Sequence, residues 1–283
     1  MFKEFIKYQS LGNHFILLDW YEKPETSVNR IIADADWKEL VIKSCEKNFG
    51  IGADGVLIIK NNQADELPEM LVFNADGSQA ENCLNGIRCV AHYLFTRKGF
   101  SHQFLIKVGR GVIACEVDGS ADEPTRVSVI TNVGKALYES KASIQVQDKT
   151  FEGHVTNIGN PHFVIEQQIS AKELHEYGKA LESHPHFPNK TNVEFFWHDA
   201  TPTAPGKPLK IFMLPFERGS GLTLACSTGA AVLLVILHRT DVIKPDQLVT
   251  CIMPGGPVVG WLDEYGSIFL QAQAHYVFSG CLP

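Results

Sequence analysis

Cys83-Leu-Asn-Gly86 and Cys226-Ser-Thr-Gly229 share one Cys-x-x-Gly pattern, and each opens an apolar stretch with helical spacing. The two cysteines are 143 residues apart in a chain of 283, so half of the sequence separates them. This spacing predicts two related halves, each with a thiol at the N-terminus of a helix. At that position the helix dipole lowers the pKa of a thiol and favours a bound anion.

The duplication extends beyond the cysteines. Gly12-Asn-His-Phe15 in the first half is echoed by Gly159-Asn-Pro-His-Phe163 in the second, 147 residues later. A strand-like apolar segment and a polar turn precede each cysteine, and the apolar segments are residues 70–73 and 211–214. A repeat of half the chain indicates two copies of one fold, because a solenoid would repeat every roughly 20 to 50 residues.

Strand-like segments predominate in both halves. Short alternating or β-branched runs bounded by Gly, Asp or Asn recur throughout. Helical periodicity is present at residues 37–45, 87–96, 171–181 and 230–237, so one helix follows each cysteine. We therefore predict an α+β fold of two pseudo-symmetric domains, each with β-strands wrapped around a central helix.

A polar turn at residues 118–124, which contains Gly and Pro, is the best candidate for a linker. It divides the chain into an N-terminal half, residues 1–120, and a C-terminal half, residues 121–271. We expect residues 272–283 to complete the N-terminal half. Both halves are long enough to bury a core of their own.

The composition argues against several classes of partner. Hydrophobic residues make up 45% of the chain and charged ones 20%, the net charge is −7, and Lys and Arg are scattered. These values argue against nucleic acid or an acidic membrane surface and favour a small-molecule ligand. The longest apolar run, residues 230–237, is far shorter than the roughly 20 residues that span a bilayer.

The first seven residues are charged and alternating, which is typical of a strand rather than of a signal peptide. We therefore expect a cytoplasmic protein. Whether the chain forms a homodimer is left open by the sequence.

The seven cysteines are an odd number and include no Cys-x-x-Cys pair. This pattern argues against a disulfide framework, a dithiol redox site and a zinc site, so we expect reduced thiols and no metal. Five of them are expected to be core residues, because cysteine is among the most buried residue types: Cys45, Cys89, Cys115, Cys251 and Cys281.

Cys83 and Cys226 differ from the other five, because polar, glycine-containing turns precede both, at residues 74–78 and 217–221. A core cysteine needs no such loop, so we interpret this pair as functional. Two thiols on opposite walls of one cleft could remove a proton from one face of a carbon and return a proton to the other face.

Six motifs together resemble diaminopimelate epimerase, and they occur in the family's order over nearly the whole chain. They are Leu11-Gly-Asn-His-Phe15, Phe49-Gly-Ile-Gly-Ala-Asp-Gly55, Phe73-Asn-Ala-Asp-Gly-Ser78 with Cys83-Leu-Asn-Gly-Ile-Arg-Cys89, Gly159-Asn-Pro-His162, Asn192-Val193, and Glu217-Arg-Gly-Ser-Gly221 with Ala225-Cys226. One of these motifs alone would be weak, but the six in order are specific.

The resemblance implies an isomerase of the amino-acid racemase and epimerase class that needs no pyridoxal phosphate or other cofactor. It would interconvert LL- and meso-diaminopimelate, in the biosynthesis of lysine and of peptidoglycan precursors. Cys83 and Cys226 fall on the family's catalytic cysteines, of which one is a thiolate base and the other a thiol acid. Both forms must be present at once, although a free thiol with a pKa of about 8.5 is mostly protonated at neutral pH.

Further site residues follow from the resemblance. His162 and Glu217 match the positions beside the thiols, where they help to set protonation; alone, they would be a structural histidine and a solvated turn carboxylate. The substrate α-carboxylate is expected on backbone N–H groups after each cysteine, around Asn85, Gly86, Ser227 and Thr228. The distal, zwitterionic end of the substrate is expected to bind Asn13, Asn74, Asn160, Asn192 and Arg218.

The chain departs from the family pattern at several positions. Leu84 and Ser227 follow the cysteines where the family usually has glycine, Leu222 stands where Glu is usual, and His14 where Asp is usual. The added side chains could crowd the carboxylate site, so they bear on rate and substrate strictness rather than on reaction type.

Two other functions stay open. One is a related cofactor-independent racemase of the same fold with altered or broader specificity, for example for glutamate. The other, more remote, is a non-catalytic thiol-redox or ligand-binding protein in which the cysteines respond to oxidation.

Overall fold

A computed structural model describes residues 4–62, 67–80, 82–109, 111–198 and 207–281 of the chain. They belong to two compact units, one within residues 1–131 and 272–283 and the other within residues 132–271. The boundary falls inside two strands, β8 (Ser128–Gly134) and β17 (Ile268–Gln273).

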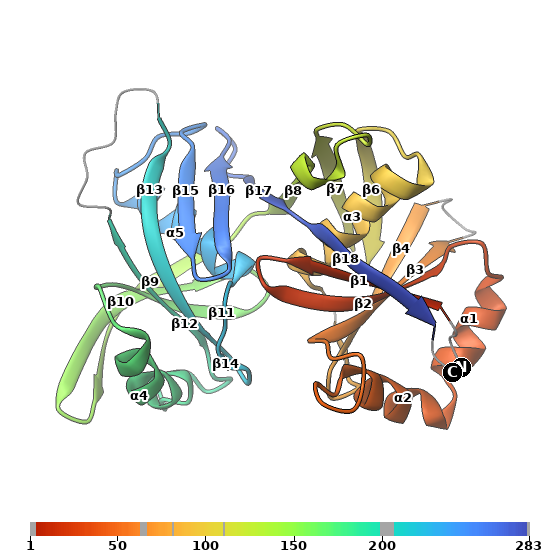
Figure 1. The fold of residues 1–283 in the computed structure, drawn as a ribbon. Coiled ribbons are helices and arrows are strands. Elements are labelled where there is room, and N and C mark those ends of the chain that lie inside the picture. Colours follow the sequence, from red (N-terminus) through yellow and green to blue (C-terminus); the bar gives the residue numbers. More distant parts are fainter. Residues whose placement is uncertain (1–3, 63–66, 81, 110, 199–206, 282–283) are drawn as a thin grey trace. The chain divides into compact units, whose positions relative to one another are not determined.

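The first unit contains strands that alternate with three α-helices (Figure 1). Its elements are β1 (Glu4–Ser10), β2 (Asn13–Trp20), α1 (Glu25–Ile32), α2 (Ala35–Cys45), β3 (Gly55–Asn62), β4 (Leu67–Asn74), β5 (Gln79–Ala80), α3 (Leu84–Lys98), β6 (Gln103–Val108), β7 (Gly111–Asp118), a 3₁₀ turn (Pro124–Arg126), the start of β8, and β18 (His275–Cys281).

The second unit repeats this arrangement with two α-helices. Its elements are β9 (Leu137–Val146), β10 (Lys149–Asn157), β11 (Pro161–Glu166), α4 (Ala171–Glu182), β12 (Asn192–His198), β13 (Leu209–Glu217), β14 (Gly221–Leu222), α5 (Ser227–Arg239), β15 (Val249–Met253), β16 (Gly256–Leu262) and most of β17.

The observed boundary lies later than the one that we placed at residue 120. The polar turn leads into β8. This strand pairs antiparallel with β7, with Thr131 opposite Cys115 and Ser128 opposite Asp118. This pairing keeps residues 121–131 in the first unit. At the other end, β18 pairs with β1, so that residues 272–283 belong to the first unit.

Helix α3 is the centre of the first unit. Every residue from Leu84 to Phe95 is buried, and the helix contacts strands β1, β2, β3, β4, β7 and β18. It ends at Gly99, whose left-handed φ of 72° costs a glycine little. A helix that is buried on all sides must be enclosed, and Figure 1 shows strands on both sides of α3.

Helix α5 has the same place in the second unit. The described residues of α5 are buried apart from Thr228, Val235, His238 and Arg239, and the helix contacts β10, β11 and β16. Its mean hydropathy is the highest among the helices described, as enclosure by strands requires. Each unit therefore has strands wrapped around one central helix, as predicted.

Strand pairings repeat from one unit to the other. In the first unit β2 and β3 are parallel, β3 and β4 antiparallel, β4 and β6 parallel, and β6 and β7 antiparallel. Strands β11, β12, β13, β15 and β16 of the second unit follow the same series. The two units are thus copies of one fold, and the register of each pair identifies equivalent residues.

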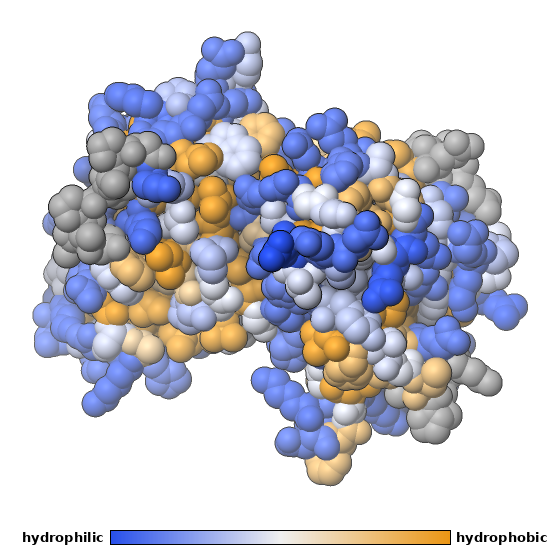
Figure 2. Space-filling view, turned by 45° about the horizontal axis from the view of Figure 1, so that its top comes forward, coloured by the Kyte–Doolittle hydropathy of each residue, from blue (hydrophilic) through white to orange (hydrophobic). Residues whose placement is uncertain are grey.

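Each unit has its own apolar core, as the sequence length allowed. Aromatic side chains are central to both, with Trp20, Trp37 and Phe73 in the first and Phe151 and Phe195 in the second. On the face shown in Figure 2, hydrophilic and hydrophobic residues are interspersed. Among the residues that the structure describes, none of the helices combines the length and apolar character needed to cross a bilayer.

Candidate active site

The Cys226 thiol lies at the start of α5, within the second unit. Its backbone is extended, its Sγ accepts a hydrogen bond from the Gly229 N–H at 3.3 Å, and Thr228 Oγ1 lies 3.4 Å away. The residue is 2% exposed. Burial raises the pKa of this thiol well above its usual value, and the charges of Glu217 and Glu194 raise it further. Burial thus outweighs the helix dipole, which alone predicted a lowered pKa.

A buried histidine and a buried glutamate meet beside this helix start. His162 on β11 and Glu194 on β12 are both fully buried, and Nδ1 of the imidazole lies 2.8 Å from Oε1 of the carboxylate. Nε2 lies 3.1 Å from Oδ1 of Asn160. One ring nitrogen of His162, one carboxylate oxygen of Glu194 and Sγ of Cys226 all lie within 4.8 Å of one another.

Glu217 completes the group from the end of β13. Thr223 Oγ1 donates to its Oε1 at 2.6 Å, and the carboxyl group also interacts with the Cys226 thiol. Burial raises the pKa of Glu217, and the nearby charge of Glu194 acts in the same direction. The structure therefore brings the predicted His162 and Glu217 to the same thiol.

Glu194 was missed in the sequence analysis. Its signal was present, because it is the one charged residue inside an otherwise apolar strand from Val193 to Trp197. A carboxylate at a position where a strand is buried needs a partner, but the sequence alone does not say that this partner is His162.

Three residues predicted to bind the distal end of the substrate lie in this unit. Asn160 Nδ2 is 3.5 Å from Thr228 Oγ1, at the start of α5. The side-chain amide of Asn192 forms hydrogen bonds with the backbone of two other segments. Its Nδ2 donates to Pro161 O at 2.9 Å, and its Oδ1 accepts from the Arg218 N–H at 2.9 Å. Asn192 therefore fixes the turn that carries Arg218.

The first unit has a different charge environment around its thiol. Cys83 Sγ lies 4.0 Å from Asn13 Oδ1, which also accepts from Asn85 Nδ2 at 3.3 Å. Asn13 Nδ2 donates to Asp54 at 2.8 Å. Asn85 Oδ1 accepts from the fully buried guanidinium of Arg88 at 2.7 Å. A cation on α3 thus stands near Cys83, whereas carboxylates surround Cys226.

Asn74 lies at the turn between β4 and β5. It is exposed, and its side chain donates to Ser78 Oγ at 3.0 Å, across the turn between β4 and β5. Gly86 packs against Leu57, because a Cβ at Gly86 would lie 2.9 Å from a methyl group of that leucine. The glycine is needed for this close approach of helix and strand.

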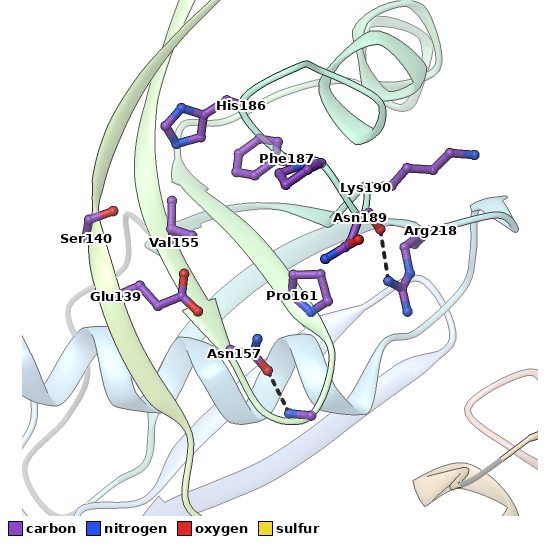
Figure 3. Close-up of a pocket in the computed structure, with 12 residues that line it drawn as sticks. Glu139, Ser140, Val155, Asn157, Pro161, His186, Phe187, Asn189, Lys190 and Arg218 are labelled. Carbon is purple, nitrogen blue, oxygen red and sulfur yellow. Dashed lines mark hydrogen bonds between the residues drawn. The ribbon is translucent and has the colours of Figure 1, made fainter.

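A pocket of about 670 Å³ opens elsewhere in the second unit (Figure 3). Glu139 and Ser140 of β9 line one side, and Lys190 and Arg218 lie at the opposite side. Arg218 Nη1 donates to Asn189 O at 3.1 Å. Arg218 is the one predicted site residue in the described lining of this pocket. The residues gathered around the second thiol, His162, Glu194, Glu217 and Cys226, do not line it.

His162, Glu194 and Cys226 also have the side-chain types that bind a metal ion. The 2.8 Å between Nδ1 and Oε1 is, however, a hydrogen-bond distance with one shared proton. A metal ion bound between these atoms would have to displace that proton.

The departures from the family pattern are distributed unequally. Leu84 and Ser227 are buried at the two helix starts, whereas Leu222 is 44% exposed. His14 Nδ1 lies 3.1 Å from Lys7 Nζ, and its Nε2 lies 3.8 Å from Asp54. Leu84 and Ser227 are therefore the two departures next to the proposed carboxylate sites.

Comparison with known proteins gives one consistent result. The family model described as diaminopimelate epimerase matches residues 5–138 and 154–275. The diaminopimelate epimerase of Carboxydothermus hydrogenoformans is 36% identical over 290 residues, with 98% of each chain covered. That of Synechococcus elongatus is 33% identical over 293 residues, with 99% of this chain and 98% of that one covered.

Solved structures with lower identity share the fold. A hydroxyproline epimerase from Agrobacterium vitis has a TM-score of 0.72 at 12% identity, with 99% of this chain and 92% of that chain covered. A PhzF-family phenazine biosynthesis protein from Bacillus anthracis has a TM-score of 0.73 at 13% identity, with 100% of this chain and 99% of that chain covered.

Proposed function

The chain belongs to the diaminopimelate epimerase family, and on that basis we propose that it interconverts LL- and meso-diaminopimelate by proton transfer through Cys83 and Cys226. One observation supports the two-thiol chemistry most strongly. The two cysteines hold the same place in two copies of one fold, each as the N-cap of the central helix. A duplicated thiol suits a reaction that needs one group for each face of a carbon.

Charge distinguishes the two thiols in this proposal. Cys226 is buried among carboxylates and starts as the thiol, so it is the acid. Cys83 starts as the thiolate, favoured by the start of α3 and by the buried Arg88 guanidinium, and is the base. Cys83 takes the α-proton from one face of the substrate, and Cys226 gives its proton to the other face. The reverse reaction begins with these protonation states exchanged.

Backbone N–H groups at the helix starts would hold the substrate α-carboxylate. Asn85 and Gly86 of α3, and Ser227 and Thr228 of α5, lie in the first turn of each helix, at the positive end of the helix dipole. Their partial positive charge opposes the negative charge that builds up as the α-proton leaves.

Distal recognition is assigned to the amides Asn13, Asn74, Asn160 and Asn192 and to Arg218, as a set that suits a carboxylate with an ammonium group. Asn74 would have to release Ser78 to take part. The proposal includes a cytoplasmic reaction that serves lysine and peptidoglycan-precursor synthesis.

Incubation of the reduced protein with LL-diaminopimelate in D₂O tests the proposed function, with NMR to follow loss of the α-proton signal. We expect exchange together with formation of the meso isomer. Cys83→Ala and Cys226→Ala should each abolish the reaction. Full activity of either variant would contradict the two-thiol mechanism.

A second candidate is a racemase of the same fold with other specificity. Leu84 and Ser227 favour it, because both are buried at the helix starts and carry side chains where the family usually has glycine. L-glutamate in a parallel D₂O incubation separates the two functions. Exchange on glutamate at a rate comparable with that on diaminopimelate would support the racemase.

A further inference from the structure

The duplicated fold provides an internal comparison for the group around Cys226. Phe15 pairs with Gly55 in the first unit as His162 pairs with Asn192 in the second. Leu57, two residues after Gly55, is therefore equivalent to Glu194. The buried apolar pair Phe15 and Leu57 of one unit is replaced by the ionisable pair His162 and Glu194 in the other.

The packing of two glycines supports this equivalence independently. A Cβ at Gly86 would lie 2.9 Å from Cδ2 of Leu57, and a Cβ at Gly229 would lie 2.7 Å from Oε1 of Glu194. Each glycine is the fourth residue of its Cys-x-x-Gly motif. The same place between strand and helix start thus holds an isobutyl group in one unit and a carboxylate in the other.

A carboxylate at this place costs stability. Glu194 is fully buried, and its Oε2 has no hydrogen-bond partner in the described part of the chain. A buried, incompletely bonded carboxylate destabilises a fold relative to a leucine of similar size. Since the fold accepts leucine at the equivalent position, stability does not explain the glutamate.

The hydrogen bonds around His162 show what the glutamate does. Oδ1 of Asn160 faces Nε2, so this nitrogen carries a hydrogen. Nδ1 shares a second proton with Glu194 Oε1. Without the carboxylate of Glu194, Nδ1 would lose the acceptor that stabilises a hydrogen on it, and the doubly protonated ring would no longer be favoured.

Other titratable groups face this pair. Glu217 from β13 and Cys226 at the start of α5 interact with Glu194 or His162. Cys251 on β15 also faces Glu194, and burial raises the pKa of its thiol to about 12, so it stays protonated at neutral pH. The titratable groups that face the pair are thus Glu217, Cys226 and Cys251.

We propose that Glu194 is a positioning residue, which holds the imidazole of His162 in its orientation and in its doubly protonated form beside Cys226. The inference rests on the proposed function. A cation held there offsets the negative charge that appears when Cys226 gives up its proton. The first unit has an apolar pair at this place, so we assign the role to the second thiol alone.

An NMR titration of the free protein tests the inference without substrate. Long-range ¹H–¹⁵N spectra report which ring nitrogens of a histidine carry hydrogen, and the His162 signal is identified by its absence in His162→Phe. With Glu194→Gln, we expect the midpoint of His162 protonation to move to lower pH by about 1 unit or more, because the opposite charge is lost. An unchanged midpoint and unchanged ring protonation would overturn the proposal.

Kinetics then show whether Glu194 acts through His162. For Glu194→Gln we expect kcat to fall about 10- to 100-fold, since positioning supplies part of an acid–base effect of about 10²–10⁴, while KM changes little. In a His162→Phe background, Glu194→Leu should cause no further loss, and this double variant should fold because it copies Phe15 and Leu57. A further loss of the same size would show that Glu194 does not act through His162.

Glu182→Gln is the matched control. Glu182 is also fully buried, and it accepts from Gly219 N–H at 3.0 Å and from Lys179 at 2.9 Å. We expect this variant to lower Tm without moving the His162 titration, and a shift as large as that of Glu194→Gln would contradict the specific role. If the wild type fails to act on diaminopimelate but the titration shifts as expected, the proposed function fails and the His162–Glu194 pairing stands.

Discussion

Gly229 is the residue at which packing and chemistry meet most closely. A methyl group there would lie 2.7 Å from Oε1 of Glu194. We expect Gly229→Ala to lower the free energy of unfolding by about 1–3 kcal/mol, the usual range for overpacking, and to lower kcat because the carboxylate is displaced. Urea denaturation and initial-rate kinetics provide the two measurements.

Gly86→Ala is the comparison for that variant. Both changes replace glycine by alanine in a helix and gain the same helix propensity. The methyl group of Leu57 can rotate away from the added Cβ, whereas the carboxylate of Glu194 is held by its hydrogen bond to His162. Gly86→Ala should therefore cost less stability. Equal losses in the two variants would show that Glu194 is not held in place.

Glu217 links function to a pH-dependent cost in stability. Its pKa is raised in the folded protein, chiefly by burial, so the folded state binds this proton more tightly than the unfolded state does. Stability from this group is complete below the unfolded pKa of 4.5 and is lost as the pH rises through the folded pKa. Glu217→Gln removes the ionisable group, so this pH-dependent loss of stability should disappear.

We therefore expect Glu217→Gln to have a higher Tm than the wild type at pH 8, with a difference that disappears below about pH 4. Its activity should fall, since the carboxyl group beside Cys226 is lost. Differential scanning calorimetry across this range is the measurement. A wild type that is more stable than the variant at pH 8 would contradict the raised pKa.

Single residues show how far sequence reasoning reaches. His162 and Glu217 were predicted through motifs, and the structure places both beside Cys226. Glu194 was not predicted, because its importance depends on a parallel strand register that brings β11 and β12 together. The raised pKa of Cys226 was also missed, since burial is a property of the packed unit.

At the scale of elements, the two helix starts differ in how they are capped. Cys226 accepts from the Gly229 N–H, whereas Cys83 makes no such cap through its side chain. Loss of an N-cap costs about 1 kcal/mol. We expect Cys226→Ala to lower Tm more than Cys83→Ala does.

Cys226→Ser is the control for the capping effect, because a serine hydroxyl also caps a helix. It should recover part of the lost Tm while remaining inactive in epimerisation, because a serine hydroxyl is a much weaker acid than the thiol that it replaces. Thermal denaturation of the three variants under reducing conditions is the measurement. A Cys226→Ala variant as stable as Cys83→Ala would show that the cap contributes nothing.

The remaining elements were predicted unequally. The long helices α3, α4 and α5 follow clear periodicity, and each begins or ends close to the predicted residues. Helix α1 was not predicted, because it is short, has no side-chain cap and buries Val28 alone among its residues. Tertiary packing of Ile31 and Ile32 against the core, rather than propensity, holds it.

On the scale of the whole molecule, the duplicated fold was predictable from the half-chain spacing of the Cys-x-x-Gly motifs. The boundary was not, because β8 continues the first unit past the polar turn by pairing with β7. The two copies have diverged in charge rather than in architecture. An apolar pair and an arginine belong to the first helix start, and a histidine with two glutamates to the second.

We proposed from this divergence that one thiol is the acid and the other the base, and the fate of the α-proton tests the two-thiol mechanism most directly. LL-diaminopimelate is allowed to react in D₂O for a small fraction of conversion, and the deuterium content of product and recovered substrate is measured separately. Two monoprotic thiols predict that the meso product carries deuterium at Cα and that the recovered LL substrate stays protiated. Early deuterium in the recovered substrate, at a rate similar to product formation, would contradict the two-thiol account.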